Sequence, residues 1–248
     1  ASAETTIQRV STALADELRR IDQVTLSMVR DRGLREILAR SQAAYPIAEQ
    51  LEDYSHLRDT LVALQDRNVL IHKIRVVVPP GRIYSNQKEN IVSSLTRAER
   101  TLLADSEETG GLRSVRQRSH KYFQLPSLLP VDIVTFGRSL PLSPEGNGAT
   151  RGILVDVLVE DVATLMVDAS ILDQVRFALV DGEHELLSTS VGNLPTDPTF
   201  DHGERLYRVR TSSVYRDVKL ESAIPFNEIF RRTIAWRNDM LLLIALVA

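Results

Sequence analysis

Apolar side chains recur at alternating steps of three and four residues near the start of the chain. The repeating positions are Ile7, Val10, Leu14, Ile21, Val24 and Met28. Residues 5–40 contain no proline and one glycine, so this period of 3.5 predicts one long helix. At roughly 1.5 Å per residue the helix would exceed about 50 Å, so we expect it to pass more than one packed unit, another helix, or both. Glu17 stands where the repeat calls for an apolar residue, which suggests looser packing there.

A second helix and a hairpin are expected next. Residues 47–68 carry apolar side chains at helical spacing, directly after Pro46, a residue that favours the first turn of a helix. The pattern then becomes extended. Residues 69–78 are rich in branched side chains, Pro79-Pro80-Gly81 interrupts them, and residues 82–86 resume the pattern, which predicts a β-hairpin.

The rest of the first half predicts one capped helix and a buried strand. Thr96 with Glu99 three residues later is a capping-box pattern, which opens a helix through about Asp105, before Gly110-Gly111. The run at residues 152–159, apolar except for Asp156, predicts a strand buried on both faces. Further strands are expected before Leu125 and at residues 131–138, and a further helix at residues 160–169.

The second half repeats the hairpin plan. Residues 175–180 and 185–189 are extended segments joined by Asp181-Gly182, a typical turn pair. Strands are expected at residues 205–212 and 215–224, and Pro225 is expected to begin a final helix. The predicted fold class is α+β, with a long N-terminal helix followed by two antiparallel-sheet modules. The predicted segments are residues 1–68 (stalk helix and second helix), 69–165 (first module), 166–225 (second module) and 226–248 (exit helix).

An apolar run at residues 240–248 suggests contact with a membrane. Its nine residues are too few to cross a bilayer, which takes about 20. The run is either the first part of a transmembrane segment or a buried C-terminal helix, and we expect the former. Trp236 just before it suits an aromatic belt. The chain is then interpreted as an extracytoplasmic stalk with two modules, tied to the membrane through its flanking segments.

Composition narrows the function classes. The chain has 248 residues, a formal charge of -3 and no cysteine. The absence of cysteine excludes a disulfide scaffold, a catalytic cysteine and thiolate metal sites, and the near-neutral charge gives no electrostatic case for a nucleic-acid partner. No catalytic, cofactor or metal motif stands out, because the five histidines are scattered and Gly146-Asn147-Gly148 has too few glycines to hold phosphate.

The order of these parts resembles a double Cache domain, a tandem of PAS-like sensor modules outside the bacterial membrane. The resemblance rests on the two hairpins, on the run at residues 152–157 and on the step at residues 224–229 into the last helix. The spacing is most similar to sensor regions of YesM-type histidine kinases. It implies an extracytoplasmic ligand-sensing domain of a transmembrane receptor, with the kinase beyond residue 248. Alternatives are a membrane-bound AraC-type regulator, a diguanylate cyclase or a chemoreceptor.

The resemblance also implies a ligand site in the first module. The candidate residues are Arg116, Arg118, Tyr122 and Thr135, with Tyr84 and Asp156 as outer candidates. Arginine can hold a carboxylate, and tyrosine can stack on a sugar. Amino-acid-binding relatives carry an arginine followed two residues later by Trp-Tyr, whereas Arg118 is followed by Ser119-His120-Lys121-Tyr122, which argues against an amino acid. For each candidate, an exposed or structural role remains the alternative.

The expected partner is a small molecule, such as a carbohydrate or an organic acid, or an extracytoplasmic binding protein. The 3.5 period is also compatible with a homodimer through the N-terminal helix, although a stripe facing the protein's own sheets would give the same pattern. Two other function classes stay open. One is a free-standing binding or adaptor protein, in which the apolar tail packs internally. The other is a hydrolase that uses scattered carboxylates such as Asp156.

Overall fold

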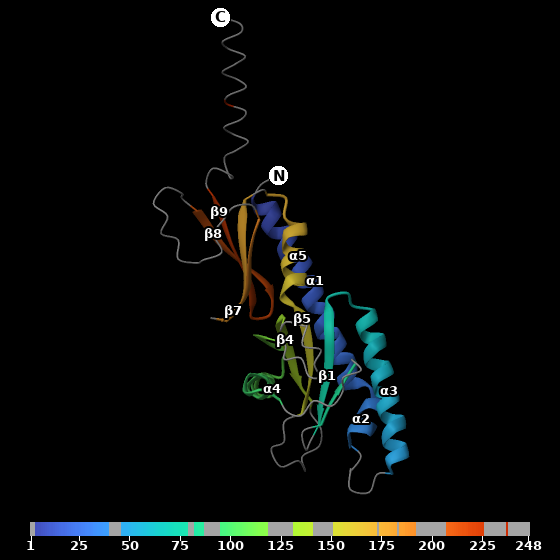
Figure 1. Ribbon diagram of the computed structural model, residues 1–248. Helices are drawn as coiled ribbons and strands as arrows, with labels where there is room; N and C mark the ends of the chain where they lie inside the picture. The colour runs from blue at the N-terminus through green and yellow to red at the C-terminus, as the bar shows by residue number, and fades with distance from the viewer. Residues whose placement is uncertain are drawn as a thin grey trace, which may run out of the picture. The chain divides into compact units, whose positions relative to one another are not determined.

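The chain forms two compact units in the computed structural model (Figure 1). Unit 1 comprises Ala1–Ala15 and Ala163–Ala248, and unit 2 comprises Asp16–Val162. The structure describes residues 3–39, 46–78, 82–86, 95–118, 131–140, 151–172, 174–182, 184–191, 207–225 and 237. The predicted exit helix and membrane segment at residues 226–248 therefore lie outside the described residues, apart from Arg237. No helix of the described part is both long and apolar enough to cross a bilayer.

The N-terminal region is two helices, so the prediction of a single rod over residues 5–40 is wrong. Helix α1 spans Ala3–Arg30 and helix α2 spans Arg32–Ala39. The break falls at Asp31, whose carboxylate accepts a hydrogen bond of 2.7 Å from the backbone N–H of Leu34. This is the bond that a helix N-cap makes, so Asp31 ends one helix and starts the next.

The apolar stripe of α1 is buried within the chain itself. All six predicted stripe residues are at most 7% exposed. Leu18, which is 5% exposed, fills the turn where Glu17 had suggested a defect. Glu17 lies beside the stripe and forms an ion pair with Arg20. The stripe is therefore continuous, and a homodimer through α1 would have to use the polar face of the helix.

Unit 2 is built on a five-stranded antiparallel sheet with strand order β2-β1-β5-β4-β3. The strands are β1 (Ile71–Val78), β2 (Arg82–Ser85), β3 (Arg113–Arg118), β4 (Asp132–Ser139) and β5 (Gly152–Leu158). The predicted first hairpin is confirmed, with Val78 opposite Arg82. Strand β5 is central and almost entirely buried, as its mostly apolar run predicted.

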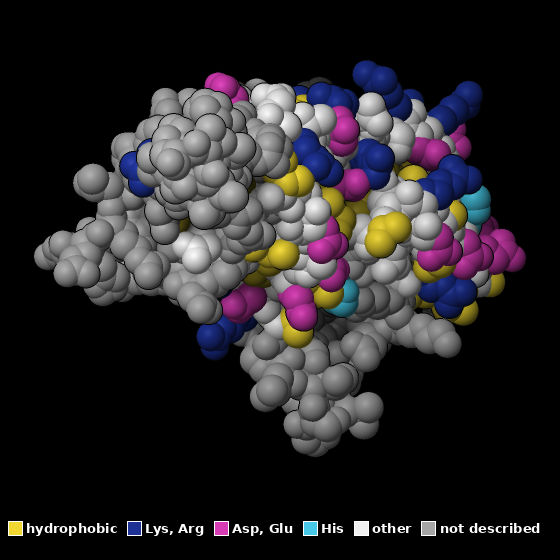
Figure 2. Space-filling model, turned by 90° about the horizontal axis from the view of Figure 1, so that it is seen from above, with side chains coloured by type: hydrophobic (Ala, Val, Ile, Leu, Met, Phe, Trp, Pro, Cys, Tyr) yellow, Lys and Arg dark blue, Asp and Glu magenta, His cyan; other side chains and the backbone are white. Residues whose placement is uncertain are grey.

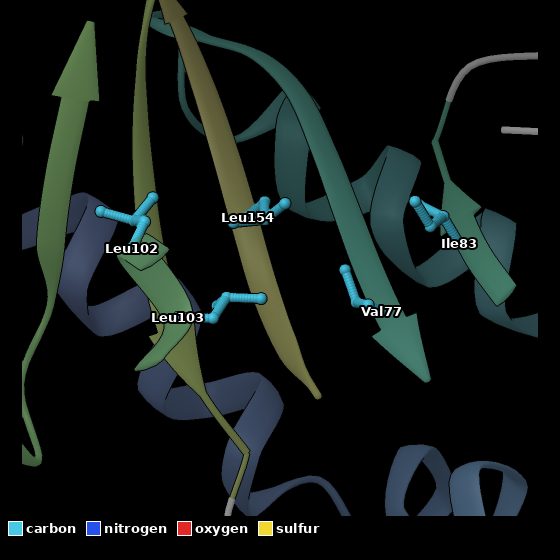
Figure 3. Close-up of a cluster of buried hydrophobic side chains, with 5 residues drawn as sticks. All are labelled: Val77, Ile83, Leu102, Leu103 and Leu154. Atoms are coloured by element: carbon cyan, nitrogen blue, oxygen red, sulfur yellow. The ribbon is translucent and has the colours of Figure 1, made fainter. Parts of the chain in front are cut away.

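Helices cover both faces of this sheet. Helix α4 (Arg97–Thr109) lies on one face, where its leucines join an apolar cluster (Figure 3). The cluster consists of Val77, Ile83, Leu102, Leu103 and Leu154. On the other face, α1 is bonded to β4, and helix α3 (Ile47–Asp66) contacts β1 and β2. The sheet is thus the middle layer of unit 2.

Helix α4 begins and ends with the signals that its sequence contains. Both bonds of the predicted capping box between Thr96 and Glu99 are present. The helix runs to Thr109, further than predicted, and ends at Gly110, whose φ of 62° lies in the left-handed region that glycine tolerates. Glu99 is thereby fixed at the first turn of α4, where it faces the sheet.

Unit 1 contains a four-stranded antiparallel sheet with strand order β7-β6-β9-β8. Its strands are β6 (Val175–Asp181), β7 (His184–Val191), β8 (Tyr207–Tyr215) and β9 (Val218–Pro225), and helix α5 spans Val159–Ala169. The second predicted hairpin is confirmed, with Gly182 at a φ of 62° in its turn. In this unit α1 approaches the sheet through Ser11, whose Oγ lies 3.4 Å from that of Ser212.

Two predictions in unit 1 are wrong. The turn between the last two strands lies at Arg216-Asp217 and not after Ser212, because Val214 and Tyr215 continue β8. Both are residue types that favour strands. Pro225 does not begin a helix: it is the last residue of β9, opposite Tyr207. Pairing of β6 with β9 extends only from Val218 to Ala223, so Pro225 borders β8 alone and sits at an edge, where its missing N–H disturbs little of the ladder.

Charges of both signs are interspersed on the described part of the face in Figure 2. This mixture agrees with the formal charge of -3. The chain therefore offers no large basic surface there for a nucleic acid.

Candidate ligand site on the five-stranded sheet

The α4-covered face of the sheet carries a group of buried polar side chains beside the apolar cluster. Residues that pair directly across antiparallel strands share a face, and Val115, Thr135 and Asp156 are paired in this way. Strand alternation adds Gln117 and Arg75 to the same face. We call the five residues that bond to one another there the Arg75 network: Arg75, Glu99, Gln117, Thr135 and Asp156.

Arg75 lies between two carboxylates. Its Nη1 donates to Oε1 of Glu99 at 2.6 Å, and its Nη2 donates to Oδ1 of Asp156 at 2.7 Å. The side chain of Arg75 is 7% exposed and those of its two partners are 3% exposed. Burial alone would lower the pKa of Arg75, but the charges of Asp156 and Glu99 outweigh burial and raise it. The guanidinium is therefore firmly charged.

Three donors hold Glu99 as a carboxylate, namely the charged Arg75, the backbone N–H of Thr96 and the amide of Gln117. Burial would raise its pKa, but the charge of Arg75 and the hydrogen bonds from the backbone of Thr96 and from Gln117 outweigh burial and lower the pKa. The Thr96 N–H donates to Oε2 at 2.8 Å, and Nε2 of Gln117 donates to Oε1 at 3.0 Å. The first turn of α4 is thus tied to two strands by one carboxylate.

Thr135 and Gln117 close the network. The hydroxyl of Thr135 donates to Oδ1 of Asp156 at 2.8 Å and accepts from Nε2 of Gln117 at 2.7 Å. Among the described residues, the buried Nε of Arg75 has no hydrogen-bond partner. A buried donor in this state calls for an acceptor, such as a ligand oxygen or a bound water. Gln117 is only half-buried, so its amide is the group of the network that a ligand can approach.

The network has the chemistry of a polar binding site and not of a metal centre. It offers hydroxyl, amide and guanidinium donors together with carboxylate acceptors, a set suited to an oxygen-rich molecule. No group of three or more histidines and acidic residues that could hold a metal ion occurs in the part of the chain that the structure describes.

Two of the six predicted site residues belong to the network, namely Thr135 and Asp156. Arg116 and Arg118 alternate with Gln117 along β3, so they lie on the opposite face of the sheet. Both are exposed, and their guanidinium groups lie 3.1 and 3.4 Å from the carboxylate of Asp132.

The two predicted tyrosines are not in the network either. Tyr84 pairs with Val76, also on the face opposite Arg75, and its ring centre lies 6.1 Å from that of Tyr54 in α3. Tyr122 lies outside the described residues.

Sequence reasoning missed Arg75, Glu99 and Gln117. A signal existed for Arg75, because it stands in a strand of branched apolar residues, where a charge needs a partner. Glu99 was assigned only to the capping box, yet it also serves the network. Gln117 carries no signal beyond its position between two arginines on a short strand.

The structure is similar to solved sensory domains. That of the Campylobacter jejuni chemoreceptor Tlp3 with isoleucine bound matches with a TM-score of 0.59 and 12% identity, over 91% of this chain and 93% of that one. The ligand-binding domain of the Pseudomonas aeruginosa PAO1 chemoreceptor PctB in complex with L-Arg matches with a TM-score of 0.53 and 10% identity, over 91% and 94%. That of PctC from the same organism, in complex with GABA, matches with a TM-score of 0.52 and 10% identity, over 87% and 95%.

The fold is that of a double Cache-like sensor domain. The predicted fold class is confirmed by these neighbours. No protein-family model matches the sequence, and no curated protein matches it significantly. The TM-scores show a shared fold, and at identities of 10–12% they show the fold alone. One fold can host many ligands, so the ligand must be argued from the site.

Proposed function

We propose that the chain is the extracytoplasmic ligand-sensing domain of a bacterial transmembrane receptor. The main support is that its fold agrees with a chemoreceptor sensory domain over 91% of its length. The Arg75 network adds a chemical reason, since it is a buried polar site on one face of a sheet module. The domain itself is a binding module, and any catalytic activity belongs to another part of the receptor.

The ligand is a small molecule rich in oxygen, either a carbohydrate or an organic acid. A ligand hydroxyl can take the place of the bond between Gln117 and Thr135, and the Nε of Arg75 can donate to a ligand oxygen. An extracytoplasmic binding protein that delivers such a molecule is the alternative partner. Amino acids and GABA belong in the same test, because they occupy the similar domains of other receptors.

A thermal-shift screen of the 248-residue chain against sugars, organic acids and amino acids tests this proposal. A ligand at about 100 times its Kd stabilises the folded state by about 2.7 kcal/mol, which raises Tm measurably. Gln117→Leu should abolish the rise for a true ligand, because the half-buried amide is lost. Thr60→Val is the control, since the Thr60 hydroxyl donates only within α3, to His56 O at 2.9 Å. No Tm rise with any compound class, or an equal rise in Gln117→Leu, would count against the proposal.

The receptor is proposed to be a YesM-type sensor histidine kinase in the cell membrane. The alternatives are a membrane-bound AraC-type regulator, a diguanylate cyclase and a chemoreceptor. The complete gene decides among them, because each carries a different domain after the membrane segment. A gene without any membrane segment would replace all four with a free-standing binding protein.

A further inference from the structure

Strand β4 is bonded on both of its faces to groups outside the sheet. On the α4-covered face, Thr135 is part of the Arg75 network. Three residues later and on the opposite face, Arg138 binds α1. The same short strand therefore contacts both the candidate ligand site and the long helix.

The bond to α1 is a buried ion pair. The guanidinium of Arg138 pairs with the carboxylate of Asp22, and its Nε donates to Oγ1 of Thr25 at 2.9 Å. The side chains of Arg138 and Asp22 are 8% and 6% exposed. A buried pair of this kind is strongly destabilised when one partner is displaced, because the other charge is left in an apolar setting. The Asp22–Arg138 pair should therefore hold α1 firmly against β4.

Strand β4 is also in close contact with α4. A Cβ atom at Gly137 would lie 2.8 Å from the side chain of Leu102, so α4 touches the backbone of β4 directly. The backbone N–H of Ser139 donates to Oγ of Ser106 in α4 at 3.0 Å. Because Glu99 ties the other end of α4 to the Arg75 network, α4 gives the network a second line of contact to β4, besides Thr135.

We propose that β4 couples the Arg75 network to α1, with the Asp22–Arg138 pair as the positioning contact on the helix. This inference rests on the proposed sensor function and describes how a change at the ligand site reaches α1. A ligand that re-pairs Gln117 or Thr135 shifts β4, and the shift changes how Arg138 holds Asp22. Helix α1 is unbroken from Ala3 to Arg30, so a change at Asp22 acts on one continuous helix.

Hydrogen exchange without ligand tests the coupling, because a coupled element must respond to a change at the other site. Thr135→Val keeps the shape of the side chain and removes its two hydrogen bonds. It should speed amide exchange in residues 16–30 of α1 by about five-fold relative to α3. Asp22→Asn should in turn speed exchange in α4 relative to α3, since coupling is reciprocal. Thr60→Val, which alters only α3, is the matched control.

Each outcome decides the question. Faster exchange in α1 than in α3, absent from the control, supports the coupling. Equal acceleration in α1 and α3, or none in α1, overturns it. If Thr135→Val does not fold, Gln117→Leu removes the neighbouring donor from the half-buried edge and gives the same readout. A chain that binds a ligand in the thermal-shift screen but shows no α1 response keeps the sensor function and loses this route.

Discussion

The Oε1 atom of Glu99 lies 2.6 Å from Nη1 of Arg75, although the two residues are 24 positions apart. Asp156, 81 positions from Arg75, binds the same guanidinium at 2.7 Å. Two buried carboxylates thus depend on one buried cation. The arrangement ties the start of α4 and the central strand β5 to β1.

Replacing the Arg75 guanidinium alone should lower the free energy of unfolding far more than replacing the charged groups of Arg75, Glu99 and Asp156 together. Arg75→Met leaves Glu99 and Asp156 buried without their partner, and we expect a loss of about 3 to 5 kcal/mol in the free energy of unfolding at pH 7. The triple variant Arg75→Met, Glu99→Gln, Asp156→Asn should recover most of that loss. Urea titrations measure both. A loss below about 1 kcal/mol in the single variant would mean that water already reaches the carboxylates.

The lowered pKa of Glu99 predicts a pH dependence of stability. Its pKa in the folded chain lies below the ordinary value of 4.5, so the unfolded state binds a proton more readily. The contribution of Glu99 is therefore complete above 4.5 and is lost as pH falls through the lower folded value. Glu99→Gln should flatten this part of the stability curve. Glu107→Gln, an exposed change on the same helix, is the control, and equal curves for the two variants would contradict the prediction.

Gly152 should not tolerate a side chain. A Cβ there would lie 2.3 Å from Cδ2 of Leu103 and 2.8 Å from the backbone oxygen of Arg138. Gly152→Ala should lower the free energy of unfolding by about 1 to 3 kcal/mol, as overpacking does. Gly33→Ala is the control. It lies within α2, where the nearest atom is at 3.4 Å, and should stabilise the helix by about 0.5 to 1 kcal/mol. The same sign for both would mean that α4 can move away from β5.

Leu18, not Glu17, should carry the packing of α1 at the centre of the stripe. Leu18→Ala removes a side chain that is 5% exposed and should cost about 2 to 5 kcal/mol of unfolding free energy. Glu17→Leu should change it by about 0.5 kcal/mol or less, because the residue lies beside the stripe. Chemical denaturation compares the two. A large gain from Glu17→Leu would restore the idea of a packing defect.

Local signals predicted most elements of the fold, because their causes are local. Helix α4 begins at the capping box of Thr96 and Glu99, as predicted, and the Asp181-Gly182 turn joins the two strands of the second hairpin. The break at Asp31 was not predicted, because the residues on both sides of it favour a helix. A single hydrogen bond, from the N–H of Leu34 to the carboxylate of Asp31, starts a new helix there. Leu18 enters the stripe because the steps between Leu14 and Ile21 are four and then three residues instead of three and then four, a difference that is equally small in sequence terms.

The candidate site was harder to predict because its bonds join distant segments. Asp156 could be suspected from a charge in a buried strand, but its partner Arg75 is a tertiary neighbour. The predicted Arg116 and Arg118 lie on the face opposite the network, because a step of one residue along β3 changes the face. Sequence spacing alone could not choose between Gln117 and Arg118 as the residue that meets Thr135.

Arg118 and Gln117 therefore offer the sharpest test of where a ligand binds. Arg118 is 74% exposed and pairs only loosely with Asp132, so Arg118→Ala should change the free energy of unfolding by about 0.5 kcal/mol or less. It should also leave the ligand-induced rise in Tm intact, whereas Gln117→Leu should remove it. The opposite result, a rise lost in Arg118→Ala and kept in Gln117→Leu, would move the site to the face that carries Arg116 and Arg118.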